Sequence, residues 1–391
     1  MREAAERLAP SFAERADLHD RDGSLPKADL EDLRAAGFFG LLVPTRLGGS
    51  GATFRDYAEV ALALGAGSGA TALIYNMHAS VTGALAMTPD DLVRALGVPE
   101  SYFASRDRIL RDAAKGAFYA VAMSERGAGS RLSAVTTTYA PEGDGWRIHG
   151  AKTFCSGAAF ADAYLIAARA AAGEPRVSHF LVPADAGVEV DPTWDALGMR
   201  ATASHDIRID AHVPHDALLG GVAGLSLLIA AVMPQWLVAS YAAVYVGVAR
   251  AAIDAAVAYL GSRTVAGESG ALTQLPAVRA RIGRADAQVA AARLVALDAA
   301  VAVDEAPGTA DTNQRIYRAK LLAGDTAAAV AASMLEACGA AATRRGSALE
   351  RLYRDARCGS LQPATSDVCA DWLGIAALGG DPENDAEVPR W

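Results

Sequence analysis

The 391-residue sequence is poor in cysteine and in charged residues, and it lacks the features typical of secreted proteins. Its cysteines form no Cys-x-x-Cys pair, which argues against both a zinc site and a disulfide framework; they are Cys155, Cys338, Cys358 and Cys369. Residues 1–7 are charged and helix-like, and they do not resemble a signal peptide. We therefore expect a cytoplasmic protein, in a reducing compartment, without a bound metal.

Runs of basic residues are also absent. The formal net charge is -9, so binding to nucleic acid or to an anionic membrane surface is not expected. Only 21% of the residues are charged and 52% are hydrophobic, as in ordered globular proteins. A chain of this length can form two or three domains around a large core. Internal repeats and low-complexity linkers are absent.

One long segment, residues 217–249, contains no charged residue at all and is long enough to span a bilayer. It consists mainly of Ala, Gly, Ser and Val, carries Pro234 and Gln235 near its centre, and has no second span to accompany it. A helix that is apolar on all sides is also typical of a protein core or a subunit interface. We expect a buried helix rather than a membrane span.

What the sequence does contain is a change of hydrophobic period along the chain. Residues 1–115 have a helical period, with a helix start at Thr88-Pro89-Asp90-Asp91 in which Thr88 is the expected N-cap. Short β-rich runs follow, at residues 133–139, 146–149, 164–166, 179–182 and 206–209. After Pro214 the helical period returns, with helices expected at 223–262, 275–305, 311–338 and 366–378.

This order predicts an α+β, mostly helical fold. We expect an N-terminal helical domain over residues 1–116 and a middle β-barrel or sandwich over 117–216. A C-terminal four-helix bundle should follow over residues 217–391.

The segment from Phe118 to Ala158 is the candidate functional site. Two strand-like stretches each end in a turn of small residues, Ser124 to Ser130 and Gly150 to Ala158, with hydroxyl groups and backbone N–H groups available. Glycine and serine allow the backbone to approach a ligand closely. The pair of turns is a plausible cradle for a flat ring with polar edges.

Together with the order of helices and strands, these turns resemble the flavin signature of the acyl-CoA dehydrogenase superfamily over essentially the whole chain. The family pattern Thr-Glu-Pro-x-x-Gly-Ser-Asp stands here at 124–131, and Gly-x-Lys-x-Trp-Ile-Thr stands at 150–156. Further matches occur at 197–202, 213–214 and 353–357. Several motifs in the right order are specific, whereas one alone would be weak. The resemblance implies that FAD is the cofactor and that the enzyme is a homodimer or homotetramer.

The resemblance also assigns cofactor-binding residues. Ser124 should bind the pyrimidine edge of the flavin beside the backbone of Met123, and Ser156 should lie near the reactive nitrogen. The remaining assignments are Phe154 against the ring, Ser130 near the pyrophosphate or the polar tail of the substrate, and Arg263 with Gln274 on the adenine half across a subunit interface.

The catalytic carboxylate of the family is missing. Dehydrogenases of this family remove an α-proton with an acid that follows the 353–357 segment, and Pro363 occupies that position here. A minority carry the base on the first bundle helix, where this chain has Leu237. Both residues are without a proton-accepting group. In addition, the family's stacking Trp is Phe154, and a Phe of the adenine site is Ala266.

The turn 154–158 is similar to that of the flavin-dependent monooxygenase branch of the superfamily. Those enzymes receive reduced flavin from a separate reductase and need no α-proton base. His78 occurs on an apolar helix where that branch often has a pocket histidine, although an ordinary core histidine is an equal alternative. Gln362 stands near the position of a C-terminal histidine found in some members. His78, Ser156 and Gln362 are therefore the catalytic candidates, while His212 and His215 are expected to be loop residues and not metal ligands.

The leading hypothesis is a two-component-type monooxygenase that uses reduced flavin and O2 on an apolar or carrier-bound small molecule. FAD is expected, and FMN is possible because Ala266 weakens the adenine site. The first alternative is an α,β-dehydrogenase of acyl-CoA or acyl-carrier-protein thioesters with a displaced base, Asp367 or Glu350. The second is a flavin-binding paralogue without catalytic activity.

Overall fold

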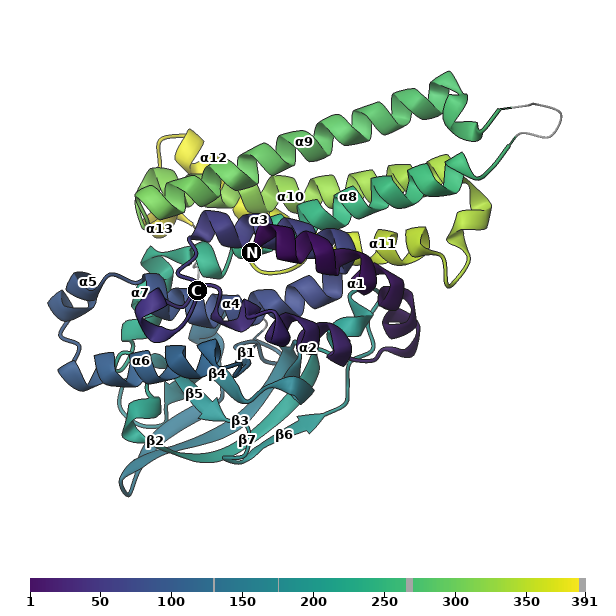
Figure 1. The fold of residues 1–391 in the computed structure, drawn as a ribbon. Coiled ribbons are helices and arrows are strands. Elements are labelled where there is room, and N and C mark those ends of the chain that lie inside the picture. The colour runs from purple at the N-terminus through teal and green to yellow at the C-terminus, as the bar shows by residue number, and fades with distance from the viewer. Residues whose placement is uncertain (129–130, 175, 265–269, 387–391) are drawn as a thin grey trace.

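The computed structural model describes residues 1–128, 131–174, 176–264 and 270–386. Helices at the two ends of the chain lie above a single twisted sheet (Figure 1). The N-terminal helices are α1 (Arg2–Asp22), α2 (Lys27–Ala35), α3 (Phe54–Gly67), α4 (Gly69–Met87), α5 (Asp90–Ala95) and α6 (Glu100–Ala114). Helix α4 passes between the sheet and the C-terminal helices (Figure 1) and is buried on nearly all sides, in keeping with its apolar sequence.

The start of α5 differs from the prediction. Its N-cap is Pro89, which provides no side-chain cap, and the Thr88 hydroxyl instead donates to the carbonyl of Ala84 at 2.6 Å. Thr88 therefore closes the end of α4. A threonine hydroxyl can bond to the backbone on either side, and the sequence does not determine which side it selects.

The sheet is formed by β1 (Tyr119–Ala122), β2 (Thr138–Glu142), β3 (Gly145–Cys155), β4 (Ala163–Ala170), β5 (Val177–Pro183), β6 (Val188–Asp191) and β7 (His205–Pro214). The strand order is β1-β4-β2-β3-β7-β6, and β5 pairs with β4. Most contacts are antiparallel, but β1 and β2 both pair in parallel with β4. The short strand β6 was not predicted, whereas β1 coincides with the strand-like stretch expected before the Ser124 turn.

The strand predicted at residues 133–139 is wrong in its first half. Residues Leu132–Ala134 form a 3₁₀ turn, and β2 begins at Thr138. The N–H groups of Thr136 and Thr137 donate to the Glu125 carboxylate, at 2.6 and 3.0 Å. A buried acid has therefore taken the donors that a neighbouring strand would need.

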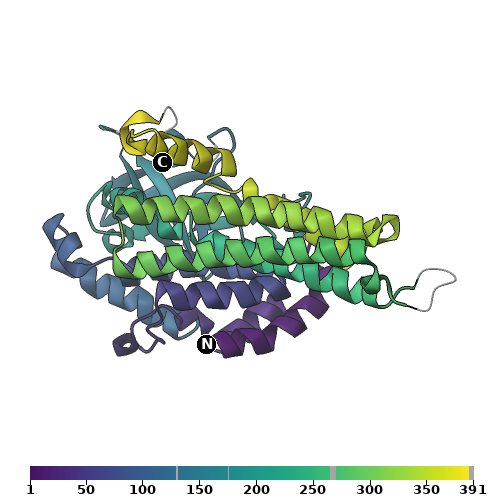
Figure 2. The same cartoon turned by 90° about the horizontal axis from the view of Figure 1, so that it is seen from above.

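The C-terminal part contains α7 (Leu225–Val232), α8 (Ser240–Gly261), α9 (Pro276–Glu305), α10 (Ala310–Cys338), α11 (Ala348–Arg357), α12 (Ser366–Ala377) and the short α13 (Pro382–Asp385). Figure 2 shows the long helices α9 and α10 lying side by side along the molecule. Helix α8 packs against both, α12 packs on α10, and α3 packs on α8. The predicted class, a mostly helical α+β fold with a central sheet, is confirmed.

The single helix predicted over 223–262 is interrupted. Helix α7 ends at Val232, a 3₁₀ turn covers Pro234–Trp236, and α8 begins only at Ser240. Met233 leaves the helical region, with φ -119° and ψ 72°, because a residue that precedes proline is disfavoured there. The division into three domains stays a prediction.

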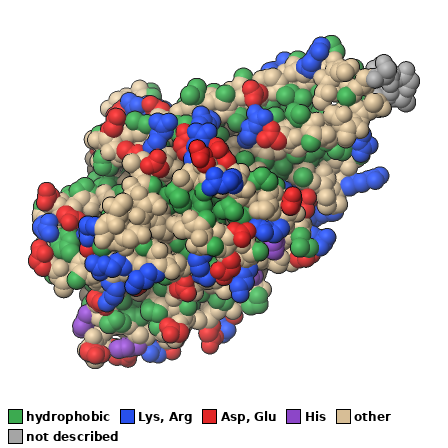
Figure 3. Space-filling model, viewed as in Figure 1, with side chains coloured by type: hydrophobic (Ala, Val, Ile, Leu, Met, Phe, Trp, Pro, Cys, Tyr) green, Lys and Arg blue, Asp and Glu red, His purple; other side chains and the backbone are tan. Residues whose placement is uncertain are grey.

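By length and composition, two of the described helical segments could cross a membrane, Pro234–Gly261 and Ala310–Cys338. The most apolar part of the first is 78% buried inside the chain, as expected for a core helix, whereas that of the second is 39% buried. Figure 3 shows acidic and basic side chains interspersed over one face of the molecule.

Candidate functional site

The two turns predicted to form the cradle lie against each other. The N–H of Thr153 donates to the carbonyl of Ser124 at 2.9 Å, and the Lys152 ammonium donates to the carbonyl of Met123 at 3.3 Å. Ser124 is half-buried near the start of the loop that follows β1. The structure therefore brings Met123 and Ser124 beside the end of β3, as the cradle requires.

A buried ion pair fixes this arrangement. The Lys152 ammonium lies 2.7 Å from the Glu125 carboxylate, which also accepts hydrogen bonds from Thr136 and Thr137. Burial alone would raise the pKa of Glu125, but the donors from Lys152 and Thr136 outweigh it and lower the pKa to about 2. The carboxylate is thus fully engaged in holding the loop, so it is a poor candidate for a catalytic base.

Phe154 is held outward by an irregularity in the sheet. The β3–β7 register shifts between Lys152 and Cys155, and Phe154 has a φ of 58°, which is rare for a residue other than glycine. Its ring is 60% exposed and meets the ring of Trp194 edge to face, with centroids 5.6 Å apart. An exposed aromatic face in a strained conformation beside Ser124 suits the stacking of a flat ring.

Ser156 belongs to a short chain of hydroxyl groups. Its Oγ lies 2.8 Å from the Oγ of Ser204, which lies 2.6 Å from the Oγ1 of Thr202. Thr202 donates to the carbonyl of Met199 at 2.8 Å. Because Thr202 uses its only proton on the Met199 carbonyl, Ser204 donates to Thr202, and Ser156 in turn donates to Ser204. The Ser156 hydroxyl therefore has a defined and buried position.

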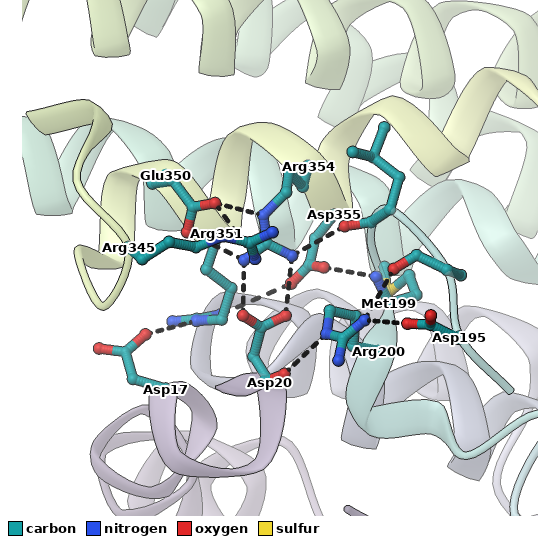
Figure 4. Close-up of polar contacts among 12 residues, drawn as sticks. Asp17, Asp20, Asp195, Met199, Arg200, Arg345, Glu350, Arg351, Arg354 and Asp355 are labelled. Carbon is teal, nitrogen blue, oxygen red and sulfur yellow. Dashed lines mark hydrogen bonds and ion pairs between the residues drawn. The ribbon is translucent and has the colours of Figure 1, made fainter. Parts of the chain in front are cut away.

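The loop that supplies Thr202 and Ser204 is anchored by charged residues (Figure 4). The N–H of Met199 donates to the Asp355 carboxylate of α11 at 2.6 Å. Next to it, Arg354 forms ion pairs with Asp20 of α1 at 2.5 Å and with Glu350 at 2.6 Å. Helices from the two ends of the chain thus support the loop behind Ser156.

His78 lies in α4, directly behind β1. Its Nδ1 accepts the N–H of Tyr119 at 3.1 Å, so the proton is on Nε2, which donates to the carbonyl of Phe39 at 2.8 Å. Burial lowers the pKa of His78 to about 4. Both ring nitrogens are therefore occupied by backbone groups, which favours the core histidine over a residue that contacts substrate.

Gln362 and Pro363 lie on the turn between α11 and α12. The buried Lys320 of α10 donates to the carbonyls of Gly359 at 2.9 Å and Gln362 at 3.0 Å, and burial lowers the pKa of Lys320 to about 8. The side-chain oxygen of Gln362 has no hydrogen-bond partner among the described residues. The turn is thus fixed to α10 from behind.

Arg263 and Gln274 lie together between the end of α8 and the start of α9. Figure 1 shows this end of the two helices away from β1 and β3, the strands that lead into the cradle. Both residues are exposed, and the guanidinium of Arg263 stacks on the ring of Tyr259, 4.6 Å from its centroid. Within one chain they are therefore separated from Met123, Ser124, Phe154 and Ser156. Ser130 lies outside the described residues.

A cavity of about 110 Å³ lies beside the cradle, with Met123 and Val121 at one side. Its walls come from α4, β4, β5, α7 and the segment around the 3₁₀ turn before α8. The lining residues that carry polar side-chain groups are Ser80, Thr88, Tyr102, His179, Ser226, Gln235, Trp236 and Tyr241, and the others are apolar or glycine. Among the described residues, the lining includes neither an acidic nor a basic side chain apart from His179.

Leu237, at the alternative position for the family's base, lines this cavity. Neither displaced-base candidate does. Glu350 is paired with Arg354 in the charged cluster, and Asp367 is exposed at the start of α12. None of the described residues therefore places a carboxylate at the cavity wall.

The polar groups in the cavity were missed by sequence reasoning. His179 was expected only as part of a strand, and Trp236 as part of a helix. Gln235 did provide a signal, because it is one of few amide side chains in the charge-free segment. What the sequence could not show is that the chain breaks at Pro234 and turns this residue toward β5.

Comparison with known proteins agrees with this architecture. Models of the acyl-CoA dehydrogenase N-terminal, middle and C-terminal domains match residues 1–91, 120–212 and 238–371 in that order. The three matches cover most of the chain and follow the succession of helices, sheet and helices.

The relatives include a nitrososynthase, a putative acyl-CoA dehydrogenase and a monooxygenase. L-evernosamine nitrososynthase from Micromonospora sp. is 31% identical over 97% of this chain and 90% of that protein. Putative acyl-CoA dehydrogenase YdbM from Bacillus subtilis is 28% identical over 95% of each chain. The FMN-bound structure of TdsC from Paenibacillus sp., a dibenzothiophene monooxygenase, superposes with a TM-score of 0.84 at 26% identity over 97% of each chain.

The domain matches, the extent of these similarities and the shared fold lead to one conclusion. The chain belongs to the acyl-CoA dehydrogenase family of flavin-dependent oxidoreductases.

Proposed function

We propose that this enzyme is a flavin-dependent monooxygenase, which oxidises a small and mostly apolar molecule with O2 and reduced flavin supplied by a separate reductase. The observation that carries the proposal is the cavity beside the cradle. Its described lining contains no carboxylate, and the alternative base position is Leu237. An α-proton abstraction requires a base within hydrogen-bond reach, and the cavity wall provides none.

The cradle residues fit a flavin. The outward ring of Phe154 provides a stacking face, and the half-buried Ser124 with the Met123 backbone provides polar contacts for a ring edge. The buried ion pair between Glu125 and Lys152 holds the two turns at a fixed separation. When bound, a reduced flavin would supply the electrons that activate O2, with one oxygen atom leaving as water and the other entering the substrate.

The protein's own part is to position groups and to exclude water. The Ser156 hydroxyl, which donates its proton to Ser204, keeps oxygen lone pairs that can accept a hydrogen bond from a flavin N–H placed against it. The apolar cavity wall excludes bulk water, which protects an oxidising species from unproductive decay. We assign His78 a supporting role behind β1, since both of its nitrogens are engaged, and we leave Gln362 as a residue of the adjoining turn.

The names of the similar proteins support the oxygenase class. Of the three relatives described above, TdsC is named a monooxygenase, and its solved structure contains FMN. For this chain we propose FAD, with FMN as the alternative. Contact of Arg263 and Gln274 with an adenine group would require a second subunit, because both lie away from the cradle of their own chain.

The test is to mix the anaerobically reduced, flavin-loaded protein and a candidate substrate with isotopically labelled O2. We expect one labelled oxygen atom in the product and oxygen uptake that depends on substrate. A new carbon–carbon double bond formed without oxygen, or bleaching of bound flavin by an acyl thioester, would instead establish a dehydrogenase. Bound flavin that responds to neither would identify the inactive paralogue.

A further inference from the structure

Three residues that line the cavity each carry a buried polar atom without a hydrogen-bond partner among the described residues. These atoms are the Nε2 of His179, the Oε1 of Gln235 and the Nε1 of Trp236, in side chains that are 4%, 2% and 4% exposed. Buried polar groups are almost always paired in folded proteins, and leaving one unpaired costs about 1–3 kcal/mol. Three such groups in the wall of one cavity point to a ligand that pairs with them.

The three groups have complementary chemistry. The indole N–H of Trp236 can only donate and the amide oxygen of Gln235 can only accept. His179 is neutral, because burial and the nearby Lys152 charge lower its pKa to about 4, so its Nε2 can donate or accept according to the tautomer. His179 comes from β5, whereas Gln235 and Trp236 come from the 3₁₀ turn before α8. A ligand must therefore offer both a donor and an acceptor.

The rest of the wall limits the size, shape and charge of that ligand. Methionine and aromatic side chains line it, including Met77, Met233 and Tyr241, and these favour flat or polarisable molecules. Trp236 is held tightly, since a Cβ added at Gly83 would lie 2.1 Å from its ring. With no acidic or basic partner among the described lining residues, a charged ligand would lose its hydration without compensation.

We propose that the substrate is an uncharged aromatic molecule about the size of one substituted ring, bearing a hydroxyl group or a ring N–H that pairs with His179, Gln235 and Trp236. This inference rests on the proposed function and narrows its substrate class. The alkyl chain of an acyl thioester would fill the same volume but leave all three polar groups unpaired. The polar groups therefore discriminate between ring-bearing and fatty acyl substrates.

The test measures binding to the full chain without flavin, by calorimetric titration with matched probes. The probes are 4-ethylphenol, its near-isostere 4-ethyltoluene, which replaces the hydroxyl by a methyl group, and 4-ethylbenzoate, which is charged. We expect 4-ethylphenol to bind at least about tenfold more tightly than either of the others, the size of effect that one hydrogen bond to a buried group provides. Equal or tighter binding of 4-ethyltoluene would overturn the proposal.

Variants on two separate elements connect the preference to the named residues. Gln235→Leu and His179→Leu should each reduce the preference for 4-ethylphenol over 4-ethyltoluene to less than about threefold. Gln314→Leu, on α10 and outside the cavity, is the matched control and should keep the full preference. If either leucine variant fails to fold, Trp236→Phe removes the indole donor with an aromatic replacement. A preference that persists in all folded cavity variants would refute the assignment.

The binding experiment tests the ligand class and the oxygenation experiment tests the reaction, so an error in one proposal can be told from an error in the other. Tight, hydroxyl-dependent binding without any oxygenated product would overturn the proposed monooxygenase and leave the ligand class intact. Labelled oxygen entering a product while 4-ethyltoluene binds as well as 4-ethylphenol would overturn the ligand class alone.

Discussion

At the scale of single residues, His78 is a buried group whose neutral state contributes to stability. Its folded-state pKa of about 4 lies below the ordinary value of 6.5, so between these pH values the unfolded chain binds more protons than the folded one. The contribution is complete above pH 6.5 and is lost as the pH falls towards 4. A shift of this size corresponds to roughly 3 kcal/mol.

We therefore expect His78→Gln, which keeps a donor and an acceptor, to flatten the decrease in unfolding free energy between pH 6.5 and 4. Urea denaturation at several pH values measures the slope. His212→Gln, on the exposed side of β7, is the control and should leave the slope as in the wild type. His179, whose pKa is also about 4, should retain its share of the decrease in both variants. Identical slopes for His78→Gln and the wild type would contradict the assignment.

The Glu125–Lys152 pair gives the second prediction at this scale. Glu125→Gln leaves the Lys152 ammonium buried without its carboxylate, and breaking such a pair typically costs about 3–5 kcal/mol. The double variant Glu125→Gln with Lys152→Met removes the isolated charge and should recover part of that loss. Urea denaturation measures all three proteins. A single variant that loses less than about 1 kcal/mol would show that the pair does not hold the cradle.

The site was partly predictable from its residues. Motif order predicted that the two turns adjoin, and Met123 and Ser124 do contact the end of β3 at Lys152 and Thr153. The partners that define their chemistry lie far along the chain, such as Ser204 for Ser156 and Phe39 for His78. Hydrophobic pattern contains no information on such pairings, so the choice between a catalytic and a structural His78 required the three-dimensional structure.

At the scale of elements, the crossing of α3 and α8 depends on two glycines. A Cβ at Gly65 would lie 2.4 Å from the carbonyl oxygen of Val244, and one at Gly247 would lie 2.5 Å from that of Leu62. Both neighbours are backbone atoms, which cannot rotate away. The two helices therefore approach more closely than any side chain would permit, and this closeness positions α8 next to the cavity.

We expect Gly247→Ala to destabilise the protein by about 1–3 kcal/mol through overpacking. The matched control is Gly283→Ala in α9, where a Cβ would meet nothing within 4 Å. There alanine should stabilise the helix by about 0.5–1 kcal/mol, because it has the higher helix propensity. Thermal unfolding of the two variants should thus shift in opposite directions. A stabilising effect at Gly247 would mean that the helices can separate without cost.

Helices with a strong hydrophobic period were predicted well, whereas elements whose bounds depend on tertiary contacts were not. The predicted helices at 275–305 and 311–338 agree with α9 and α10 within a residue. The break between α7 and α8 was missed because the apolar composition continues across Pro234. The four-residue strand β6 is too short to show a period, and it exists because β7 pairs with it.

At the scale of the whole molecule, several large apolar side chains of the described residues remain exposed to solvent in the single chain. The charge-free segment was expected to be a buried helix of a core or a subunit interface, and its α8 part is buried within the chain itself. Exposed leucines occur on several elements, and two of them lie on the adjacent helices α9 and α10, with Leu294 at 66% and Leu322 at 43% exposure. The ion pairs Arg315–Asp298 and Arg281–Glu336 set the antiparallel register of these helices, which brings the two leucines to the same level.

Apolar side chains that two adjacent helices expose at one level are typical of an interface with another copy of the chain. We therefore expect the protein to form a homodimer or homotetramer through this face, and Leu294→Glu combined with Leu322→Glu to dissociate it. Light scattering after size-exclusion chromatography measures the mass. Leu378→Glu, which places the same charge on an exposed leucine at the end of α12, should leave the assembly intact. An unchanged mass for the double variant would place the interface elsewhere.

Because Arg263 and Gln274 lie away from the cradle of their own chain, dissociation should also weaken FAD binding more than FMN binding, which titration of both flavins would reveal.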